Sequence, residues 1–417
     1  MSPELIIENF QARKVFDSRG SETIEIGIFT KKGFGRFSSP SGASTGRWEV
    51  QAYPKEGINA SIKILNSELR SKLIGMSAED QKGIDDILHE IDGTENFSRI
   101  GGNVALAISV SSALAAASSK NIPLFLQLSS IHGTALPHPL GNVIGGGLHA
   151  KGDKTDIQEF LVLPLRAKTI TEAASANIEI HRELTRLLEK EQVSVGGKGD
   201  EGAWIAGLET TKALEVIDNA CKKVEENSDV KMGIGMDVAA STLWNKENNH
   251  YDYGKDGRNF DTGEQIEFIL SLIEEFNLVY VEDPLHEDDF ESFGELTKRA
   301  NKVLICGDDL FTTNIQRLEL GLKHNAGNAI IIKPNQVGTL SDTFKTAKEA
   351  ESHGYTTITS HRSGETCEPI ISHLAVALNS PIIKCGVLGG ERVSKVNELI
   401  RIEEILGEKA RLADIKL

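Results

Sequence analysis

Three acidic residues each follow an apolar run of the sequence and are candidates for one metal site. Asp237 ends GIGMD, Glu282 ends LVYVE, and Asp308 follows VLICG. Carboxylates that lie close together repel one another unless a cation neutralises them, and ligation by oxygen alone favours a hard ion such as Mg²⁺. Any one of these acids alone is more typical of a helix cap or a solvated strand end. Three acids in the same kind of position favour a magnesium site.

Two lysines, Lys333 in AIIIK and Lys384 in PIIK, also end apolar runs. An unpaired ammonium is costly to bury, so each lysine must reach water, pair with acids, or have a lowered pKa. For a single lysine the ordinary alternative is a side chain that extends to the surface from a strand end. Beside a pocket that holds metal ions, we expect burial and positive charge to lower the pKa of both lysines, which would suit one of them to act as a base.

Between the two lysines the segment TSHRSGET places His361, Arg362 and Ser363 next to one another. A guanidinium presents a planar fork of donors that fits phosphate or carboxylate, and an adjacent hydroxyl adds a further donor. Such a triplet is most often part of a surface loop. Its position between the two lysine-ending runs predicts an anion site instead.

Two further carboxylates, Glu159 in QEF and Glu201 in GDEGAW, end two earlier runs, with His149 of GGGLHAKG near in the sequence. Paired carboxylates can share a proton, so that one of them serves as a general acid. The triple glycine is neither a dinucleotide-binding motif nor a P-loop, because the helix register and the G-K-[ST] are missing, and a flexible loop is the alternative. A second Ser/Thr/Gly loop, SPSGASTG at 39–46, is either a mobile connector or a lid that completes a second metal site.

These residues require elements that carry them to one place. From about residue 133, apolar runs alternate with helical segments, and their polar ends recur at roughly 25-residue intervals, about one strand plus one helix. This pattern predicts a closed β/α barrel with its site at the carboxyl ends of the strands. The eight predicted runs are EFLVLP, VSVGGKGDE, MGIGMDVAAS, NLVYVEDPL, KVLICGDDLF, AIIIKPNQVG, TTITSHRSGE and PIIKCGVLGG.

The first 132 residues predict a smaller α+β domain. A hairpin is expected from SETIEIGIFT and KKGFGRFSS, because the first alternates charged and apolar residues and a Lys-Gly turn joins the two. Three helices should follow, since their apolar or small residues recur at helical spacing. These are NASIKILNSELRSKLI, AEDQKGIDDILHEI and GGNVALAISVSSALAAASSK.

Composition limits the classes of function. The 417 residues carry a net charge of −16, which argues against nucleic acid as a main partner because phosphate binding needs a basic face. The 4 cysteines form no C-x-x-C pair, which excludes a zinc ribbon and a dense disulfide framework. The N-terminus lacks the pattern of a signal peptide, and the stretch 104–119 is too rich in serine and alanine to span a bilayer, so we expect a cytoplasmic protein with no membrane partner.

With these motifs taken together, the chain resembles the enolase family nearly from end to end. The segments that carry the resemblance occur in the family's order: FDSRG, PSGASTG, NVIGGGLHA, QEF, GDEG, DVAAS, EDPL, GDDL, KPNQVGTL, SHRSGET and ERVSKVNELIRIEE. The resemblance implies dehydration of 2-phosphoglycerate to phosphoenolpyruvate in glycolysis and gluconeogenesis, with two Mg²⁺ ions in each active site. It also implies a homodimer or a homo-octamer.

The resemblance assigns a role to each candidate residue. Lys333 matches the base, Glu201 the proton donor and Glu159 its supporting glutamate. Asp237, Glu282 and Asp308 match the ligands of the first magnesium, and Ser44 matches a ligand of the second. Arg362 and Ser363 match phosphate contacts, and the other substrate-pocket residues are His149, Gln158, His361 and Lys384.

Some segments depart from the family pattern. The chain has GGG before His149 where the family has N-G-G, GDEGAWIA in place of GDEGGFAP, and a shortened KCGVLGGER after the last strand. Two alternatives therefore stay open at this point. One is a superfamily enzyme that acts on another carboxylate substrate, and the other is a non-catalytic binding protein on the same fold.

Overall fold

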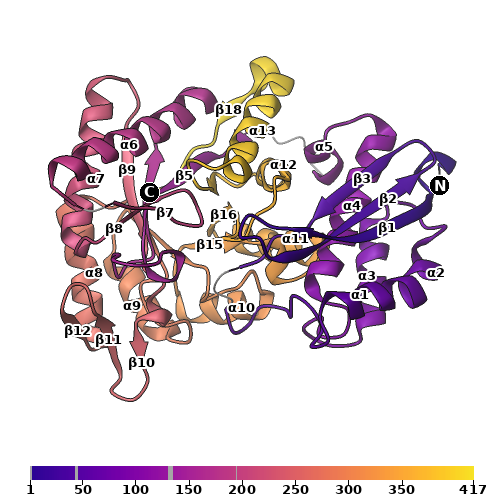
Figure 1. Ribbon diagram of the computed structural model, residues 1–417, viewed down its shortest axis with the longest axis horizontal. Helices are drawn as coiled ribbons and strands as arrows, with labels where there is room; N and C mark the ends of the chain where they lie inside the picture. The colour runs from indigo at the N-terminus through magenta and orange to yellow at the C-terminus, as the bar shows by residue number, and fades with distance from the viewer. Residues whose placement is uncertain (1, 43–45, 130–134, 194) are drawn as a thin grey trace.

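The computed structural model describes residues 2–42, 46–129, 135–193 and 195–417, and the chain forms two lobes (Figure 1). The N-terminal lobe holds an antiparallel sheet in the order β1-β2-β3, with helices packed on it. The strands are β1 (Ile7–Phe16), β2 (Glu22–Thr30) and β3 (Phe34–Ser38). The helices are η1 (Pro3–Leu5), α1 (Ile58–Ile64), the π-turn η2 (Leu65–Leu69), α2 (Arg70–Leu73), α3 (Gln81–Asp92), α4 (Gly102–Lys120) and α5 (Leu124–Leu128).

The predicted hairpin and helices of this lobe are confirmed. β2 and β3 pair with Phe29 opposite Phe34, and α4 packs against both strands. β1 has no clear sequence signal and was not predicted, because only Ile7 and Phe10 of that strand are buried and the alternation is weak. α4 is long and apolar enough to cross a membrane by length and composition, but it lies mostly buried in the core of this lobe.

The second lobe is a closed barrel with helices around it, as predicted. Among the described residues eight strands form the barrel, and β17 closes it by pairing with β5. They are β5 (His138–Gly145), β6 (Glu159–Pro164), β9 (Met232–Asp237), β13 (Tyr280–Glu282), β14 (Leu304–Gly307), β15 (Ala329–Ile332), β16 (Thr356–Ser360) and β17 (Ile382–Lys384).

Helices cover the outside of the barrel (Figure 1). They are α6 (Ile170–Lys190), α7 (Thr210–Glu226), α8 (Thr262–Phe276), α9 (Phe290–Arg299), α10 (Ile315–His324), α11 (Leu340–Ser352), α12 (Ile370–Ala377) and α13 (Gly390–Leu406). The lobe also contains the short turns η3 (Gly147–His149), η4 (Ala240–Thr242), η5 (Pro334–Gln336) and η6 (Gly407–Lys409). Small strands complete the lobe: β4 (Ala135–Leu136) with β18 (Arg411–Leu412), the pair β7 (Val195–Lys198) and β8 (Trp204–Ala206), and the meander β10 (Trp244–Asn245), β11 (His250–Tyr253) and β12 (Arg258–Phe260).

Two of the strand predictions were wrong. The run VSVGGKGDE is not a barrel strand, because β7 and β8 form a hairpin that joins the end of β5. β5 itself went unpredicted, since Pro139, Gly141 and Asn142 interrupt the apolar run.

The sheet is also not wholly parallel: β6 runs antiparallel to β5 and to β9. The connection 146–158 holds only the turn η3 and no crossover helix, which is why β5 and β6 cannot be parallel.

The reversed direction of β6 decides where Glu159 lies. Glu159 begins β6 instead of ending a run, and it pairs in register with Asp237, the last residue of β9. The start of β6 therefore lies at the same rim as the ends of the parallel strands. That rim is where the polar ends of the strands gather.

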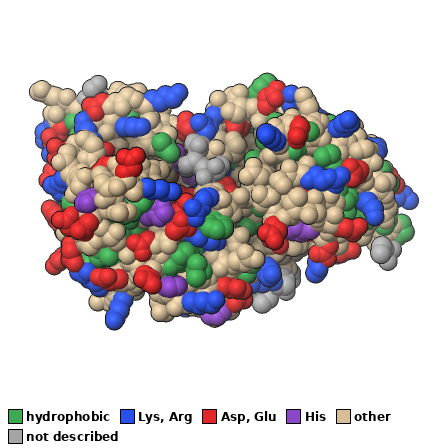
Figure 2. Space-filling model, turned by 90° about the horizontal axis from the view of Figure 1, so that it is seen from below, with side chains coloured by type: hydrophobic (Ala, Val, Ile, Leu, Met, Phe, Trp, Pro, Cys, Tyr) green, Lys and Arg blue, Asp and Glu red, His purple; other side chains and the backbone are tan. Residues whose placement is uncertain are grey.

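Apolar side chains fill the barrel below the rim. Leu140, Leu161, Tyr280, Ile331 and Ile358 belong to this buried interior cluster. A second core lies between the barrel and its helices, and a third lies in the N-terminal lobe and includes Leu340, Ile370 and Leu374 from α11 and α12. The two lobes thus share one core at their junction. Seen from below, they meet at a notch where acidic and basic side chains lie side by side (Figure 2).

Candidate active site

A polar pocket lies at the rim of the barrel. Its lining comprises Gly42, Glu49, His149, Gln158, Glu159, Glu201, Asp237, Asp308, Asp309, Lys333, Ser360, His361, Arg362, Ser363 and Lys384. Most of these residues are buried although many are charged, and Glu49, Asp308, Asp309 and Lys333 are half-buried. Buried charges must be paired, hydrogen-bonded or bound to an ion, so their partners define the site.

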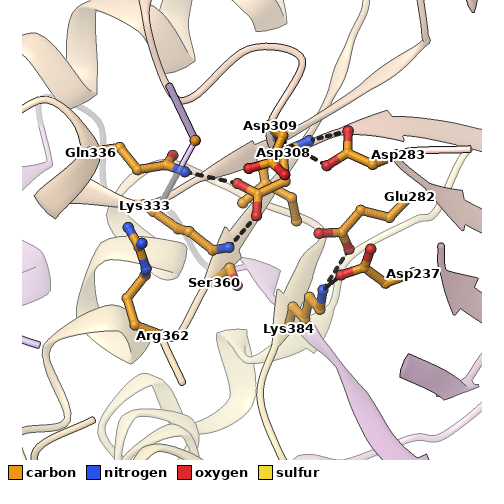
Figure 3. A network of polar contacts seen from close by, with 12 residues as sticks. Asp237, Glu282, Asp283, Asp308, Asp309, Lys333, Gln336, Ser360, Arg362 and Lys384 are labelled. Atoms are coloured by element: carbon orange, nitrogen blue, oxygen red, sulfur yellow. Dashed lines mark hydrogen bonds and ion pairs between the residues drawn. The ribbon is translucent and has the colours of Figure 1, made fainter. Parts of the chain in front are cut away.

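Lys384 points at the carboxylates of Asp237 and Glu282 (Figure 3). Its Nζ is 2.6 Å from Glu282 Oε2, 2.8 Å from Asp237 Oδ2 and 3.3 Å from Glu159 Oε2. Burial alone would lower the pKa of the lysine, but the three carboxylates outweigh burial and hold its pKa well above the ordinary value. The ammonium therefore stays charged and binds the ends of β6, β9 and β13 together.

Lys333, just after β15, points at Asp308 and forms an ion pair with its Oδ2. Gln336 Nε2 donates to the other carboxylate oxygen of Asp308 at 2.9 Å. Burial opposes the charge on Lys333, yet Asp308 outweighs it and the pKa of Lys333 is raised. Each ammonium thus has a carboxylate against it that raises its pKa, whereas the lowered pKa expected for Lys333 and Lys384 concerns a pocket that holds metal ions and stays a prediction.

The predicted metal ligands converge on this point. Glu282 and Asp308 place ligand oxygens within 4.8 Å of each other, in a group that also contains Asp283. Asp237 joins them through Lys384, which it shares with Glu282. Asp283 accepts instead from the backbone N–H groups of Asp308 (3.1 Å) and Asp309 (2.8 Å), so it holds the loop that carries Asp308.

This donor set fits a magnesium ion. The ligand atoms are carboxylate oxygens, and Glu282 Oε1 is buried without a hydrogen-bond partner among the described residues. Burial and then the negative charge of Asp237 raise the pKa of Glu282 well above its ordinary value, so both burial and repulsion disfavour its charge. A divalent cation would relieve that repulsion. Ser44, predicted to bind a second ion, lies outside the described residues.

Glu159 and Glu201 lie beside the same ring nitrogen of His149. His149 Nδ1 is 3.3 Å from Glu159 and 3.7 Å from Glu201, and His361 Nε2 is 3.4 Å from Glu201. Burial and the charge of Glu201 raise the pKa of Glu159. Burial would raise the pKa of Glu201 as well, but His361 and His149 outweigh it and hold that pKa well below the ordinary value. The two carboxyl groups thus differ, and Glu159 is the one that keeps a proton more readily.

The predicted anion site has a partner that the sequence analysis missed. Arg362 Nη1 is 2.9 Å from Glu49 Oε2, and Nη2 is 3.1 Å from Oε1, although Glu49 belongs to the N-terminal lobe. Arg362 also donates to Asn335 Oδ1 at 2.9 Å. Ser363 and Gln158 line the same pocket, and Gln158 Oε1 is buried without a hydrogen-bond partner among the described residues.

Other residues of the site gave no signal in the sequence. Glu49 is remote along the chain from Arg362, so no spacing relates the two. Asp309, whose pKa burial and Asp308 raise to about 8, stands next to a predicted ligand but ends no apolar run of its own. Arg392 is fully buried beneath the site. In the sequence it stands at the start of the α13 segment and looks like an ordinary surface arginine.

Comparison with known proteins agrees with this geometry. Residues 133–417 match the family model of the enolase C-terminal TIM barrel domain, and residues 7–128 match that of the enolase N-terminal domain. The chain is 50% identical over 403 residues to an enolase of Methanosphaera stadtmanae, across 96% of this chain and 97% of that protein. It is 49% identical to an enolase of Methanothermobacter thermautotrophicus across 99% of each, and 42% identical to one of Pyrobaculum aerophilum across 97% and 98%.

Proposed function

The chain belongs to the enolase family and is a phosphopyruvate hydratase, a glycolytic lyase that interconverts 2-phosphoglycerate and phosphoenolpyruvate, and we propose that the rim residues described above carry out this reaction. The observation that carries this conclusion is similarity to curated enolases over nearly the full length of the chain. The charged rim pocket gives that similarity a site. It supplies cations for an anionic substrate and carboxylates for a divalent ion.

We propose that Lys333 is the base that removes the C2 proton of 2-phosphoglycerate. That proton lies next to a carboxylate and is very weakly acidic, so the base must be neutral and the developing negative charge must be stabilised. The family depends on magnesium, which would be held by Asp237, Glu282 and Asp308. There it would stabilise the negative charge that develops on the substrate and offset the charge of Asp308 beside Lys333. Lys384, which is paired with Asp237 and Glu282, adds a fixed positive charge beside these ligands.

Glu201 is proposed to give a proton to the departing hydroxide. Its partner Glu159 lies beside the same nitrogen of His149, and the raised pKa of Glu159 supports its role as the carboxyl that keeps a proton nearby. Because the pKa of Glu201 is low without substrate, Glu201 must gain a proton as substrate binds. The negative charge of the bound substrate favours that protonation.

The remaining roles concern substrate and metal. Arg362 and Ser363 are proposed to bind the phosphate. His149, Gln158 and His361 would form the rest of the substrate pocket, and Ser44 would reach a second Mg²⁺, giving two ions in each site. We further propose a domain boundary between residues 132 and 133, a cytoplasmic location, and a homodimer or homo-octamer.

An absorbance assay tests this function directly. Purified protein mixed with 2-phosphoglycerate and Mg²⁺ should produce the ultraviolet absorbance of phosphoenolpyruvate, and chelation of the metal should stop it. If no absorbance appears with or without Mg²⁺, the assignment fails and a different carboxylate substrate or a non-catalytic role takes its place.

A further inference from the structure

Arg392 joins the two loops that carry the proposed proton donor and the predicted anion site. Its guanidinium lies in the first turns of α13 and is fully buried. Nη2 donates to the carbonyl of Asp200, next to Glu201, at 2.9 Å and to that of Ser363 at 2.7 Å. Nη1 donates to the carbonyl of Arg362 at 2.5 Å. One side chain thus sets the distance between the 199–203 loop and the 361–363 loop.

The fourth contact of Arg392 is with a ring nitrogen. Nη1 lies 2.6 Å from Nδ1 of His361, and the backbone N–H of Gly386 also points at this nitrogen, at 3.4 Å. A guanidinium has donors only and keeps its protons in proteins, so Nδ1 of His361 must be the acceptor. The hydrogen of the neutral ring is then on Nε2. That nitrogen is the one that faces Glu201 Oε2, at 3.4 Å.

We propose that Arg392 is a positioning residue that holds His361 as the neutral Nε2–H tautomer, so that the ring donates to the carboxylate of Glu201. This inference rests on the proposed function, in which Glu201 handles a proton. Arg392 acts through His361 and through the loop carbonyls, and its side chain is not part of the pocket lining.

The charges around His361 agree with a neutral ring. Glu201 and Glu365 favour the imidazolium, whereas burial and Arg392 oppose it, and burial is the largest influence. Glu365 is itself paired with Lys395 of α13 at 2.8 Å. The balance lowers the pKa of His361 to about 4. At neutral pH the ring is therefore a hydrogen-bond donor to Glu201 and carries no charge.

Nitrogen NMR of the intact protein, without substrate, tests the tautomer. The protein is labelled with ¹⁵N at its 11 histidines, and the signals of His361 are identified by their loss in His361→Gln. The protonated nitrogen should be the one that couples to both carbon-bound ring hydrogens, which is Nε2, from pH 6 to pH 8. A hydrogen on Nδ1, or a doubly protonated ring at pH 7, would overturn the proposal.

A pair of methionine substitutions separates positioning from stability. Arg392→Met should mix the two tautomers, raise the pKa of His361 and move the acidic limb of the kcat profile to higher pH. Lys395→Met also removes a buried cation of α13, but Lys395 contacts Glu365 and the carbonyl of Thr366 and not His361. It should lower stability and raise the pKa of His361 through the unpaired Glu365, but it should leave the hydrogen of the neutral ring on Nε2. Unchanged His361 signals in Arg392→Met, or equal changes in both variants, would contradict the proposal.

If Arg392→Met does not fold, the wild-type spectrum still decides the tautomer. If the protein lacked activity on 2-phosphoglycerate, the proposed function would fail while the nitrogen signals would be unaffected. The two claims can therefore be refuted separately.

Discussion

Arg362 of the barrel and Glu49 of the N-terminal lobe form a buried two-point ion pair, with nitrogen to oxygen distances of 2.9 and 3.1 Å. The side chains are 4% and 7% exposed, so little water screens the pair. The pair joins the N-terminal lobe to the rim of the barrel at the predicted phosphate site.

Glu49→Ala should lower the free energy of unfolding by about 3 kcal/mol, because a buried charge loses its carboxylate partner. Denaturant unfolding measures this value. The exposed pair of Arg299 and Glu267, 39% and 65% exposed, offers a control, and Glu267→Ala should cost less than about 1 kcal/mol. Equal losses of unfolding free energy in Glu49→Ala and Glu267→Ala would show that the buried ion pair at the lobe junction contributes little to stability.

The neutral ring of His361 predicts a pH dependence of stability. Its pKa is about 4 in the folded protein, against about 6.5 in an unfolded chain. Between these values the unfolded chain binds a proton that the folded protein does not, so stability falls as the pH falls. The contribution between pH 7.5 and pH 5 is about 2 kcal/mol.

Urea unfolding at these two pH values checks this prediction. His361→Gln should lose about 2 kcal/mol less than the wild type on going to pH 5. His353→Gln, which replaces an exposed histidine, should retain the wild-type slope. Identical slopes for wild type and His361→Gln would contradict a depressed pKa.

The sequence predicted the barrel because its strands are short apolar runs that end in polar residues. Asp237, Glu282, Lys333 and Lys384 could each be found from such a run alone. β5 could not, since Pro139 and Gly141 break its pattern and its burial comes from the closure of the barrel. The direction of β6, which places Glu159 at the rim, depends on a connection without a helix and also escaped prediction.

The electrostatics of the site depended on contacts between distant residues. Glu49 meets Arg362 and Arg392 meets His361 only in the folded chain, so no local pattern indicates either pair. The raised pKa of Lys333 could not be predicted either, because its cause is Asp308, which lies far from Lys333 along the chain and meets it only at the rim. Which charges lie adjacent is a property of the packed rim and not of the spacing.

Gly386 lies where the loop of Glu201 crosses the end of β17. A Cβ at this position would lie 2.2 Å from the carbonyl oxygen of Glu201, so the backbone would have to move. Gly386→Ala should therefore lower kcat by roughly 10- to 100-fold, since catalysis is sensitive to small displacements of the reacting groups. Gly390→Ala is the matched control, because a Cβ there meets nothing within 4 Å, and its kcat should be unchanged. Steady-state kinetics of the two variants decide this, and a fully active Gly386→Ala would contradict the close approach.

Removal of the metal should abolish turnover and lower the melting temperature. Magnesium at 100 times its Kd should stabilise the wild type by about 2.7 kcal/mol, because it binds only the folded protein. Asp308→Asn should lose this stabilisation, measured by thermal unfolding with EDTA and with Mg²⁺. Asp229→Asn replaces a carboxylate that is 95% exposed and should keep it. Magnesium stabilisation of equal size in Asp308→Asn would exclude Asp308 as a ligand.

Exchange of the C2 proton of 2-phosphoglycerate in D₂O, followed by proton NMR, tests the proposed base most directly. Lys333→Ala should lose both the exchange and the formation of phosphoenolpyruvate, because no other group is proposed to remove that proton. Glu201→Gln is the matched variant, since it should retain exchange while product formation falls sharply. If Lys333→Ala, folded and loaded with Mg²⁺, still exchanges the C2 proton at the wild-type rate, then Lys333 is not the base.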